Sequence, residues 1–289
     1  MPPESKRRDM PRRAEGRVIV LLDDSPESMR ALEMAAGLVR RRHGTLLGLF
    51  VEDLDLVRSA GFAFAGEIGA MSGQVRQRAP GRMDAAIRRR LRQVRLALQQ
   101  TAMACGIEHE LIVRRGRVVE EILAFSTPGD MLIVGRVGWS RRLGRSMGSV
   151  PLALARTAPG AVLIWASTPP RPGGRIAVLA ENGSTLASAL AVAGERARLH
   201  RCGISVLLPP GMKPEQVEAV QRQAATTFDP AEVLHDVRRL PAANPASLLH
   251  ALGQASAVEL VLSRRGQLLN DPIGARLLER IRLPVCISP

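Results

Sequence analysis

The chain has 289 residues, of which 46% are hydrophobic and 2% aromatic, and its formal net charge is +14. This length is enough for two ordinary domains with separate cores, and no apolar run approaches the roughly 18 residues that a membrane span requires. The scarcity of aromatic residues leaves few of the stacking platforms that bind single-stranded nucleic acid.

Basic residues are concentrated in the first part of the chain. Up to Thr168 there are 27 basic and 17 acidic residues, and after Thr168 there are 14 basic and 10 acidic residues. This excess of positive charge favours a polyanionic partner, for which ATP and nucleic acid are equally suitable. The arginines at 88–90, 92 and 95 fall on one helical segment, where we expect a solvated face, because charge alone carries no base readout. We therefore do not expect a nucleic-acid partner.

The remaining composition predicts a cytoplasmic protein with neither a metal site nor a membrane partner. Residues 1–16 are polar and basic, show no apolar core of a signal peptide, and are expected to form a disordered tail. Cys105, Cys202 and Cys286 lack metal-type spacing and are odd in number, which favours small core or edge residues in a reducing cytosol. The five histidines form neither an i,i+4 pair nor a cluster with Cys or Asp.

From residue 17 onward, apolar runs typical of buried parallel strands alternate with segments of helical periodicity. Ser25 and Pro26 are suited to be the N-cap and first residue of a helix. In chain order we expect strand 17–23, a helix from Pro26 to Gly44, strand 46–51, helix 82–105, strand 107–113, helix 118–125, strand 131–134, helix 150–156 and strand 161–165. This alternation predicts a doubly wound parallel sheet with right-handed crossovers.

The second part of the chain repeats this pattern. Residues 169–174 have the composition of a linker, and the segment from Arg175 to Glu181 repeats the first strand. Residues 259–266 correspond to 131–138, and 284–288 match the last strand. A tandem duplication is the economical interpretation. We therefore predict an α/β protein with two tandem five-stranded parallel sheets, in domains 17–168 and 175–289.

The two copies differ at positions that bear on binding. Asp23 of the first copy corresponds to Glu181, Gly135 corresponds to Ser263, and a Gly-Ser pair of the first copy has no counterpart. The segment between the loop and the last strand has 18 residues instead of 23, and Asp271 would bring a carboxylate where an anion should lie. We expect the second copy to keep the fold without binding a ligand.

One loop carries the clearest chemical signal. Gly135-Arg136-Val-Gly138 is followed, after nine residues, by Gly148-Ser149, directly behind a buried strand. Glycines can adopt left-handed conformations and let main-chain N–H groups approach an anion. The Ser149 hydroxyl and the first N–H groups of the next helix add donors and a favourable dipole. Arginines are frequent in the loop, and we expect Arg136 to contact a phosphate because it lies inside the glycine turn.

Together these residues resemble the universal stress protein family, whose ATP-binding members carry a Gly-x2-Gly-x9-Gly-(Ser/Thr) loop. The resemblance implies a Rossmann-like sheet of five strands, ATP as the bound ligand, and Mg²⁺ that enters with its phosphates. It implies that Asp23 approaches the ribose and adenine side and that Val51 lines the base pocket. The expected nucleotide-binding residues are Leu21, Asp23, Val51, Val134, Gly135, Arg136, Gly138, Gly148, Ser149 and Val150.

Further expectations come from the same resemblance. By likeness to other tandem members, the last strands of the two halves should pair antiparallel and form a pseudo-dimer within one chain, and a homodimer also remains open. Pro151 lies two residues after Ser149, in the expected first turn of the helix. Because proline has no N–H, this turn has one donor fewer for an anion. If Ser149 caps the helix, this proline is sterically acceptable, and we favour that arrangement.

The segment Asp53–Pro80 has no equivalent in the second half. It contains a Gly- and Phe-rich stretch at 61–66 and further glycines at 69 and 73. Disorder, a lid over the base pocket and a subunit contact are all compatible with its composition.

These observations favour a cytosolic stress sensor or adaptor that binds ATP in its first half and has no catalytic residues. One alternative is a slow ATP hydrolase on the same fold. Adenylating enzymes of related fold carry Ser-Gly-Gly-x-Asp-Ser after the first strand, whereas this chain has Asp23-Asp24-Ser25-Pro26, and no Ser–His or Cys–His arrangement can be assigned. The other alternative is a basic interaction module that binds no nucleotide.

Overall fold

The computed structural model describes residues 17–42, 44–53, 66–68, 75–77, 80–137, 147–166, 173–181, 183–229 and 233–289. The expected tail 1–16, the loop glycine Gly138 and most of the linker 169–174 lie outside the described residues. Of the segment 53–80, the structure describes its two end residues and two short strands, β3 (Gly66–Ile68) and β4 (Val75–Gln77), which pair antiparallel. The proposals of a disordered tail and of a lid therefore stay predictions.

The first half follows the expected order of strands and helices. Its elements are β1 (Val18–Leu21), α1 (Pro26–Arg42), β2 (Leu46–Asp53), α3 (Pro80–Cys105), β5 (His109–Gly116), α4 (Val118–Phe125), β6 (Met131–Gly135), α5 (Ser149–Thr157) and β7 (Ala161–Trp165). Each predicted strand and helix is confirmed, with boundaries that differ by a few residues. Ser25 accepts a hydrogen bond from the Ser28 N–H at 3.1 Å, so it is the N-cap of α1, and Pro26 opens the helix.

The second half repeats the order of the first. Its elements are β8 (Arg175–Leu179), α6 (Gly183–His200), β9 (Gly203–Leu208), α7 (Pro214–Thr227), β10 (His235–Arg239), α8 (Pro245–Gln254), β11 (Ala257–Ser263), α9 (Gln267–Asn270), α10 (Pro272–Arg280) and β12 (Val285–Ser288). The difference lies between β11 and β12, where two helices, α9 and α10, stand in the place of α5.

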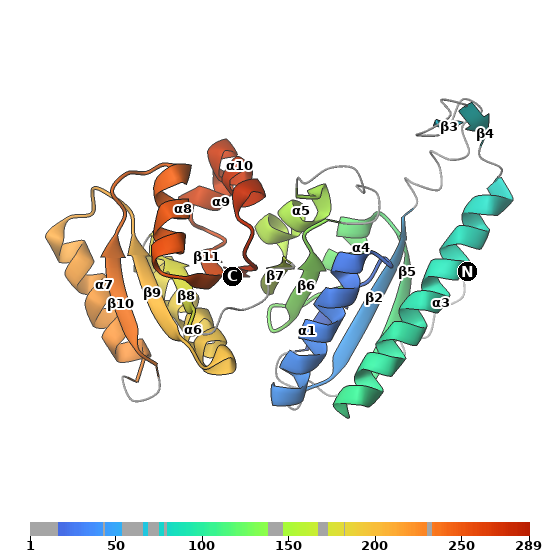
Figure 1. Cartoon of the computed structure of the whole chain (residues 1–289), viewed down its shortest axis with the longest axis horizontal. Coiled ribbons are helices and arrows are strands. Elements are labelled where there is room, and N and C mark those ends of the chain that lie inside the picture. The colour runs from blue at the N-terminus through green and yellow to red at the C-terminus, as the bar shows by residue number, and fades with distance from the viewer. Residues whose placement is uncertain are drawn as a thin grey trace, which may run out of the picture.

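The strands of both halves form one sheet of ten, in the order β10-β9-β8-β11-β12-β7-β6-β1-β2-β5 (Figure 1). Within each half all neighbours are parallel. The last strands, β7 and β12, pair antiparallel, with Leu163 opposite Cys286, as the resemblance implied. The two five-stranded sheets are therefore continuous.

The alternation of side chains along each strand supplies two cores, one on each face of the sheet. Val18 and Val20 of β1 pack on one face, and Ile19 between them packs on the other. Helices α1, α3, α6 and α7 cover the first face through buried residues such as Leu32, Val94, Leu190 and Val220. Helices α4, α5, α8 and α10 cover the second face through Ile122, Leu154, Leu248 and Leu277. Each core extends across both halves.

Strand order also fixes where a ligand can enter. In the first half, β1 lies between β6 and β2, so the chain direction of the crossovers reverses between β1 and β6. In open α/β sheets, ligands bind outside the carboxyl ends of the strands at this switch point. The residues that follow β1, β2 and β6 are therefore the first place to look for a site.

Candidate functional site

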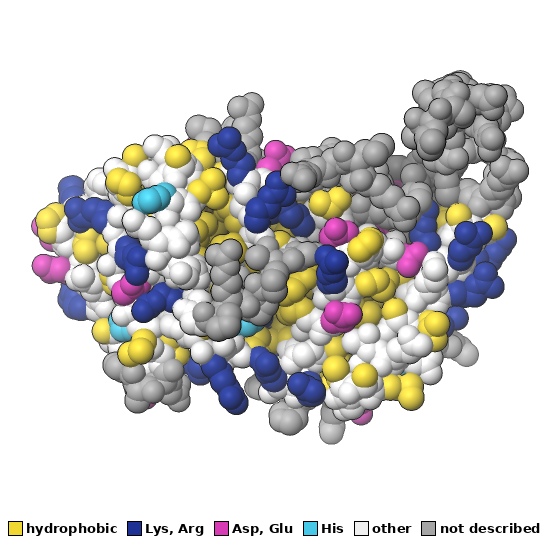
Figure 2. Space-filling model, in the orientation of Figure 1, with side chains coloured by type: hydrophobic (Ala, Val, Ile, Leu, Met, Phe, Trp, Pro, Cys, Tyr) yellow, Lys and Arg dark blue, Asp and Glu magenta, His cyan; other side chains and the backbone are white. Residues whose placement is uncertain are grey.

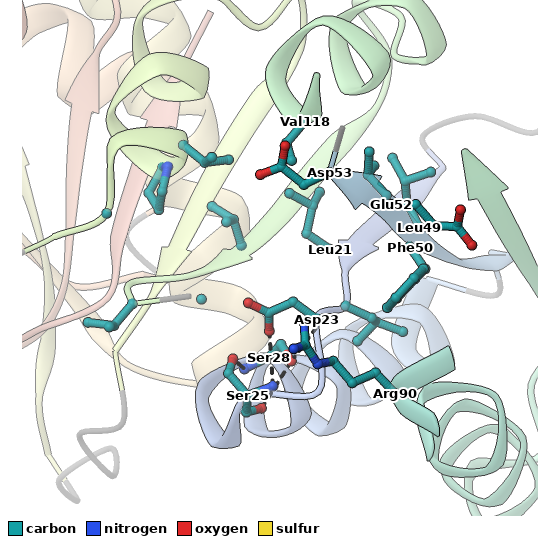
Figure 3. Close-up of a pocket in the computed structure, with 18 of the residues that line it drawn as sticks. Leu21, Asp23, Ser25, Ser28, Leu49, Phe50, Glu52, Asp53, Arg90 and Val118 are labelled. Carbon is teal, nitrogen blue, oxygen red and sulfur yellow. Dashed lines mark hydrogen bonds between the residues drawn. The ribbon is translucent and has the colours of Figure 1, made fainter. Parts of the chain in front are cut away.

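A pocket of about 190 Å³ opens at the carboxyl ends of β1, β2 and β6 (Figure 3). Eight of the ten residues expected to contact a nucleotide line it: Leu21, Asp23, Val51, Val134, Gly135, Gly148, Ser149 and Val150. Gly138 lies outside the described residues. Arg136 is described but does not line the pocket. The pocket thus brings together residues that lie more than a hundred positions apart in the sequence.

The turn between β1 and α1 shapes one wall. Asp23 accepts a hydrogen bond from the Ser25 N–H at 3.0 Å through one carboxylate oxygen, which forms a local Asx turn. Asp24 has a φ of 64°, a left-handed conformation that Asp tolerates better than most residues. The side chain that caps α1 is that of Ser25, as the sequence indicated. The strand end and the turn together bring Asp23 to the pocket wall.

The walls of the pocket also contain residues that the sequence did not assign to a ligand. They include Ile87 and Arg90 on α3, Val118 at the start of α4, Ser25 and Ser28 at the start of α1, and Glu52 and Asp53 at the end of β2. Ile87 and Arg90 are three residues apart, so they lie on one face of α3. Val118 comes two residues after the end of β5, which reaches the same edge of the sheet.

Charged side chains lie at the rim of this largely apolar pocket. Arg90 extends from α3 toward Ser28 and Asp23 (Figure 3). Asp53 lies beside Val118, and the Glu52 carboxylate points away from it, as adjacent residues of a strand do (Figure 3). An apolar slot with a few polar groups at its edge is the usual form of a small-molecule site.

Gly135 is closely packed. A Cβ there would lie 3.1 Å from the Glu27 Cβ and 3.3 Å from the Ser28 nitrogen, so the end of β6 approaches the first turn of α1 closely, and a larger residue would require a small shift there. Gly135 and Gly148 both have negative φ, so the left-handed conformation that the sequence suggested is absent from both. At Gly135 the structure therefore favours glycine through close packing and not through a left-handed conformation.

The start of α5 differs from the favoured arrangement. Gly148 is the N-cap, Ser149 is the first helical residue, and the cap has no side-chain hydrogen bond, so the expectation that Ser149 caps the helix is wrong. The Gly148 N–H donates to the Arg136 carbonyl at 3.0 Å, and this bond fixes the cap one residue earlier. Helical geometry leaves the N–H groups of Ser149 and Val150 without intrahelical acceptors, whereas Pro151 has none to offer.

Arg136 turns away from the pocket and into the second half. Its guanidinium donates to the carbonyl oxygens of Leu278, Glu279 and Ile281 at the end of α10, with 2.7 Å to Leu278. The residue is 6% exposed, and burial lowers the pKa of its guanidinium. Arg136 is therefore not placed to make the expected phosphate contact. Its positive charge lies instead against the carbonyl groups at the end of α10.

The corresponding position in the second half is filled by the protein itself. Glu181 accepts a hydrogen bond from the Leu268 N–H at 2.9 Å, and a Cβ on Gly266 would lie 1.8 Å from its other carboxylate oxygen. Asp271, expected to bring the carboxylate, instead ends α9. Burial raises the pKa of Glu181, and the hydrogen bond from Leu268 opposes this rise. A carboxylate of the chain thus lies where the first half has its pocket.

The described residues show neither a metal-ligating cluster nor a membrane-spanning helix. No group of three or more His, Cys, Asp and Glu side chains within them is arranged to hold a metal ion. None of the helices in this part of the chain has the length and apolar character needed to cross a bilayer. Figure 2 shows Lys and Arg side chains spread over both halves of the visible face.

Residues 16–165 match the model of the universal stress protein family. A universal stress protein from Archaeoglobus fulgidus DSM 4304 superimposes with a TM-score of 0.66 at 16% identity, covering 95% of this chain and 96% of that one. A functionally unknown protein from Pseudomonas aeruginosa PAO1 superimposes with a TM-score of 0.55 at 16% identity, covering 95% and 92%. At such identities the likeness shows the fold. A search of curated proteins gives no match.

Proposed function

Because this chain belongs to the universal stress protein family, we propose that its first half binds an adenine nucleotide, with ATP as the first candidate. The observation that carries the proposal is the pocket at the switch point. It brings Asp23, Val51 and the start of α5 to one place. We further propose that the protein acts as a cytosolic sensor or adaptor and not as an enzyme.

The pocket supports a defined orientation of the ligand. The base would lie in its apolar part, between Val51 and Val118, because flat aromatic rings bind well between apolar walls. The ribose would lie near Asp23, whose carboxylate is a hydrogen-bond acceptor for hydroxyl groups.

The phosphates would lie at the start of α5. There the N–H groups of Ser149 and Val150 and the Ser149 hydroxyl can donate to an anion, and the helix dipole favours negative charge. Mg²⁺ would enter with the phosphates, and the chain would contact the nucleotide rather than the metal.

The second half has a different part in this proposal. Since Glu181 fills the place that corresponds to the pocket, we propose that residues 175–289 keep the fold without binding a nucleotide. The antiparallel pair of β7 and β12 supports a pseudo-dimer of this half with residues 17–168.

The test is a binding measurement on the full chain. Thermal-shift and calorimetric titrations with ATP, ADP, AMP and cAMP should show saturable binding of at least one nucleotide. A ligand at 100 times its Kd stabilises the native state by about 2.7 kcal/mol. Gly148→Leu places a side chain at the phosphate end and should weaken binding at least about tenfold, the equivalent of one hydrogen bond to a charged group.

The matched control is Gly129→Leu, at an exposed turn where a Cβ meets no atom within 4 Å. It should bind as the wild type does. Equal affinity of Gly148→Leu and wild type would exclude this pocket as the site. Phosphate release that is catalysed by the wild type and lost in Asp23→Ala would identify the protein as a hydrolase instead.

A further inference from the structure

The side chain of Arg136, at the start of the glycine loop of the first half, contacts the second half. Arg136 stands two residues before Gly138 and reaches the end of α10, where it donates to the carbonyls of Leu278, Glu279 and Ile281. These carbonyls belong to the last turn of the helix and the residue after it, which carry the negative end of the helix dipole. The contact joins residues more than 140 positions apart.

The backbone of Arg136 holds both ends of the same loop. Its N–H donates to the Trp165 carbonyl at 3.0 Å, which ties the end of β6 to β7. Its carbonyl accepts from the Gly148 N–H at 3.0 Å, which fixes the cap of α5. The entry of the loop at Gly135 and its exit at Gly148 therefore meet at one residue. A displacement of Arg136 would move the N–H groups that face the pocket.

An equivalent arginine makes the reciprocal contact. Arg264 follows β11 as Arg136 follows β6, and its guanidinium donates to the carbonyls of Ala155 at 3.0 Å and Gly160 at 2.6 Å in the first half. In each half, therefore, an arginine donates hydrogen bonds to carbonyl groups at or just beyond the end of a helix in the other half. The two contacts differ in one respect: Arg136 belongs to a loop that lines a pocket, whereas beyond Arg264 the Glu181 carboxylate fills the space.

We propose that Arg136 is a positioning residue through which the second half sets the geometry of the nucleotide site. Nucleotide binding in the first half and packing of α10 in the second half are then energetically coupled. This inference rests on the proposed function. It gives the second half a task, since the end of α10 supplies the acceptors that hold Arg136, whose backbone fixes the end of β6 and the cap of α5.

The physical basis is conformational entropy: nucleotide binding and the contact of Arg136 with α10 restrict the same part of the chain, so the two share one entropic cost. A nucleotide that fixes the loop also fixes Arg136, so the guanidinium remains on α10 for a larger fraction of the time. By linkage, an intact contact with α10 strengthens nucleotide binding by the same factor. The structure thus predicts an effect of the ligand at the end of α10, which contributes no residue to the pocket lining.

The experiment compares Arg136→Gln with Arg264→Gln in the full chain. Both substitutions remove a guanidinium that bridges the halves, so Arg264→Gln reports the effect of losing such a bridge in general. Calorimetric titration with the nucleotide that binds the wild type best should give about tenfold weaker binding for Arg136→Gln. Arg264→Gln should stay within about twofold of the wild type, since its acceptors, Ala155 and Gly160, lie toward and beyond the carboxyl end of α5, away from the phosphate end at Ser149 and Val150.

Hydrogen exchange supplies a readout that a merely structural role would not change. In the wild type, saturating nucleotide should slow exchange of the amides at 277–283, and this protection should be absent in Arg136→Gln and present in Arg264→Gln. Equal affinities for the wild type and Arg136→Gln would overturn the inference and leave the proposed function intact. If Arg136→Gln does not fold, unchanged exchange at 277–283 in the nucleotide-bound wild type overturns it. Failure of the wild type to bind any nucleotide would instead remove the proposed function.

Discussion

At the scale of single residues, Asp23 and Glu181 show how one additional methylene changes a site. Both follow the first strand of their half, 158 positions apart. Asp23 is short, and its carboxylate accepts from the N–H two residues along the chain. The longer Glu181 reaches the N–H of Leu268 and lies against Gly266. The same backbone position therefore lines a pocket in one half and fills it in the other.

Glu181→Gln should stabilise the protein at pH 7 by about 1 kcal/mol, because an uncharged amide no longer buries an unpaired carboxylate oxygen. The pKa of Glu181 is raised by burial, so its ionisation lowers stability as pH rises through the unfolded value of about 4.3 toward the higher folded value. The advantage of the variant should appear above pH 5 and disappear at lower pH.

Equilibrium urea unfolding at several pH values measures this effect. Glu218→Gln, an isosteric change at an exposed position on α7, is the matched control and should stay within about 0.5 kcal/mol of the wild type. A variant less stable than the wild type at pH 7 would show that the charge on Glu181 contributes favourably to folding.

The contacts of Arg136 could not be predicted from the sequence. Its position inside the glycine turn indicated a phosphate contact, but its acceptors are carbonyls of α10, more than 140 residues away. No local sequence pattern predicts which helix end an arginine will contact, because every helix end has the same free carbonyl groups. Leu21, Asp23 and Val51 were predictable as neighbours, since they end or follow adjacent parallel strands.

At the scale of elements, the two halves differ between the loop and the last strand, where the second half has α9 and α10. The first half has one helix, α5, between its loop and its last strand. In the second half the chain turns at Asp271-Pro272, between the two short helices. A Cβ on Gly274 would lie 1.4 Å from the Leu268 carbonyl oxygen, so this turn closes on itself at a position that tolerates glycine alone.

Gly274→Ala should therefore destabilise the protein by about 3 kcal/mol, in the range expected where a new atom meets buried backbone. The control is Gly253→Ala on α8, where a Cβ meets no atom within 4 Å and a helical glycine is replaced by a better helix former. That variant should be stabilised by about 0.5 to 1 kcal/mol. Thermal and urea unfolding of both variants provide the measurement, and equal stability of Gly274→Ala and wild type would contradict the tight turn.

Elements were easier to predict from the sequence than their ends. Buried runs such as Met131–Val134 have few alternatives in a parallel sheet, and the Ser25-Pro26 pair marks a helix start through its own chemistry. The start of α5 was misjudged by one residue because its cap depends on a hydrogen bond from Gly148 to Arg136 across the loop. Contacts between distant residues decide such details.

At the scale of the whole molecule, both cores and the sheet run through the two halves. Deep in the second half, Arg196 and Glu259 form a buried ion pair with distances of 2.7 and 2.6 Å. Burial opposes the charge on Glu259, but Arg196 and His200 outweigh it and lower the pKa of this carboxyl. Loss of one partner leaves the other charged and uncompensated.

Glu259→Gln should lower the free energy of unfolding by about 3 kcal/mol in both halves, because they share their cores. Hydrogen exchange of peptides from β1 and β2 reports on the first half, and peptides from β8 and β9 report on the second. Glu120→Gln, in an exposed pair with Arg117, is the control and should change stability by less than about 0.5 kcal/mol. Exchange that accelerates in the second half alone would show two independent folding units.

The pairing of β7 with β12 has a consequence for assembly. When such an edge joins two separate chains, dilution separates them and each chain can exchange its companion. Here both edges belong to one polypeptide, so their effective concentration is set by the tether and does not depend on how much protein is present. Every copy therefore carries one half with the pocket described above and one half in which Glu181 fills the corresponding place, in a ratio that neither expression level nor mixing with homologous chains can alter.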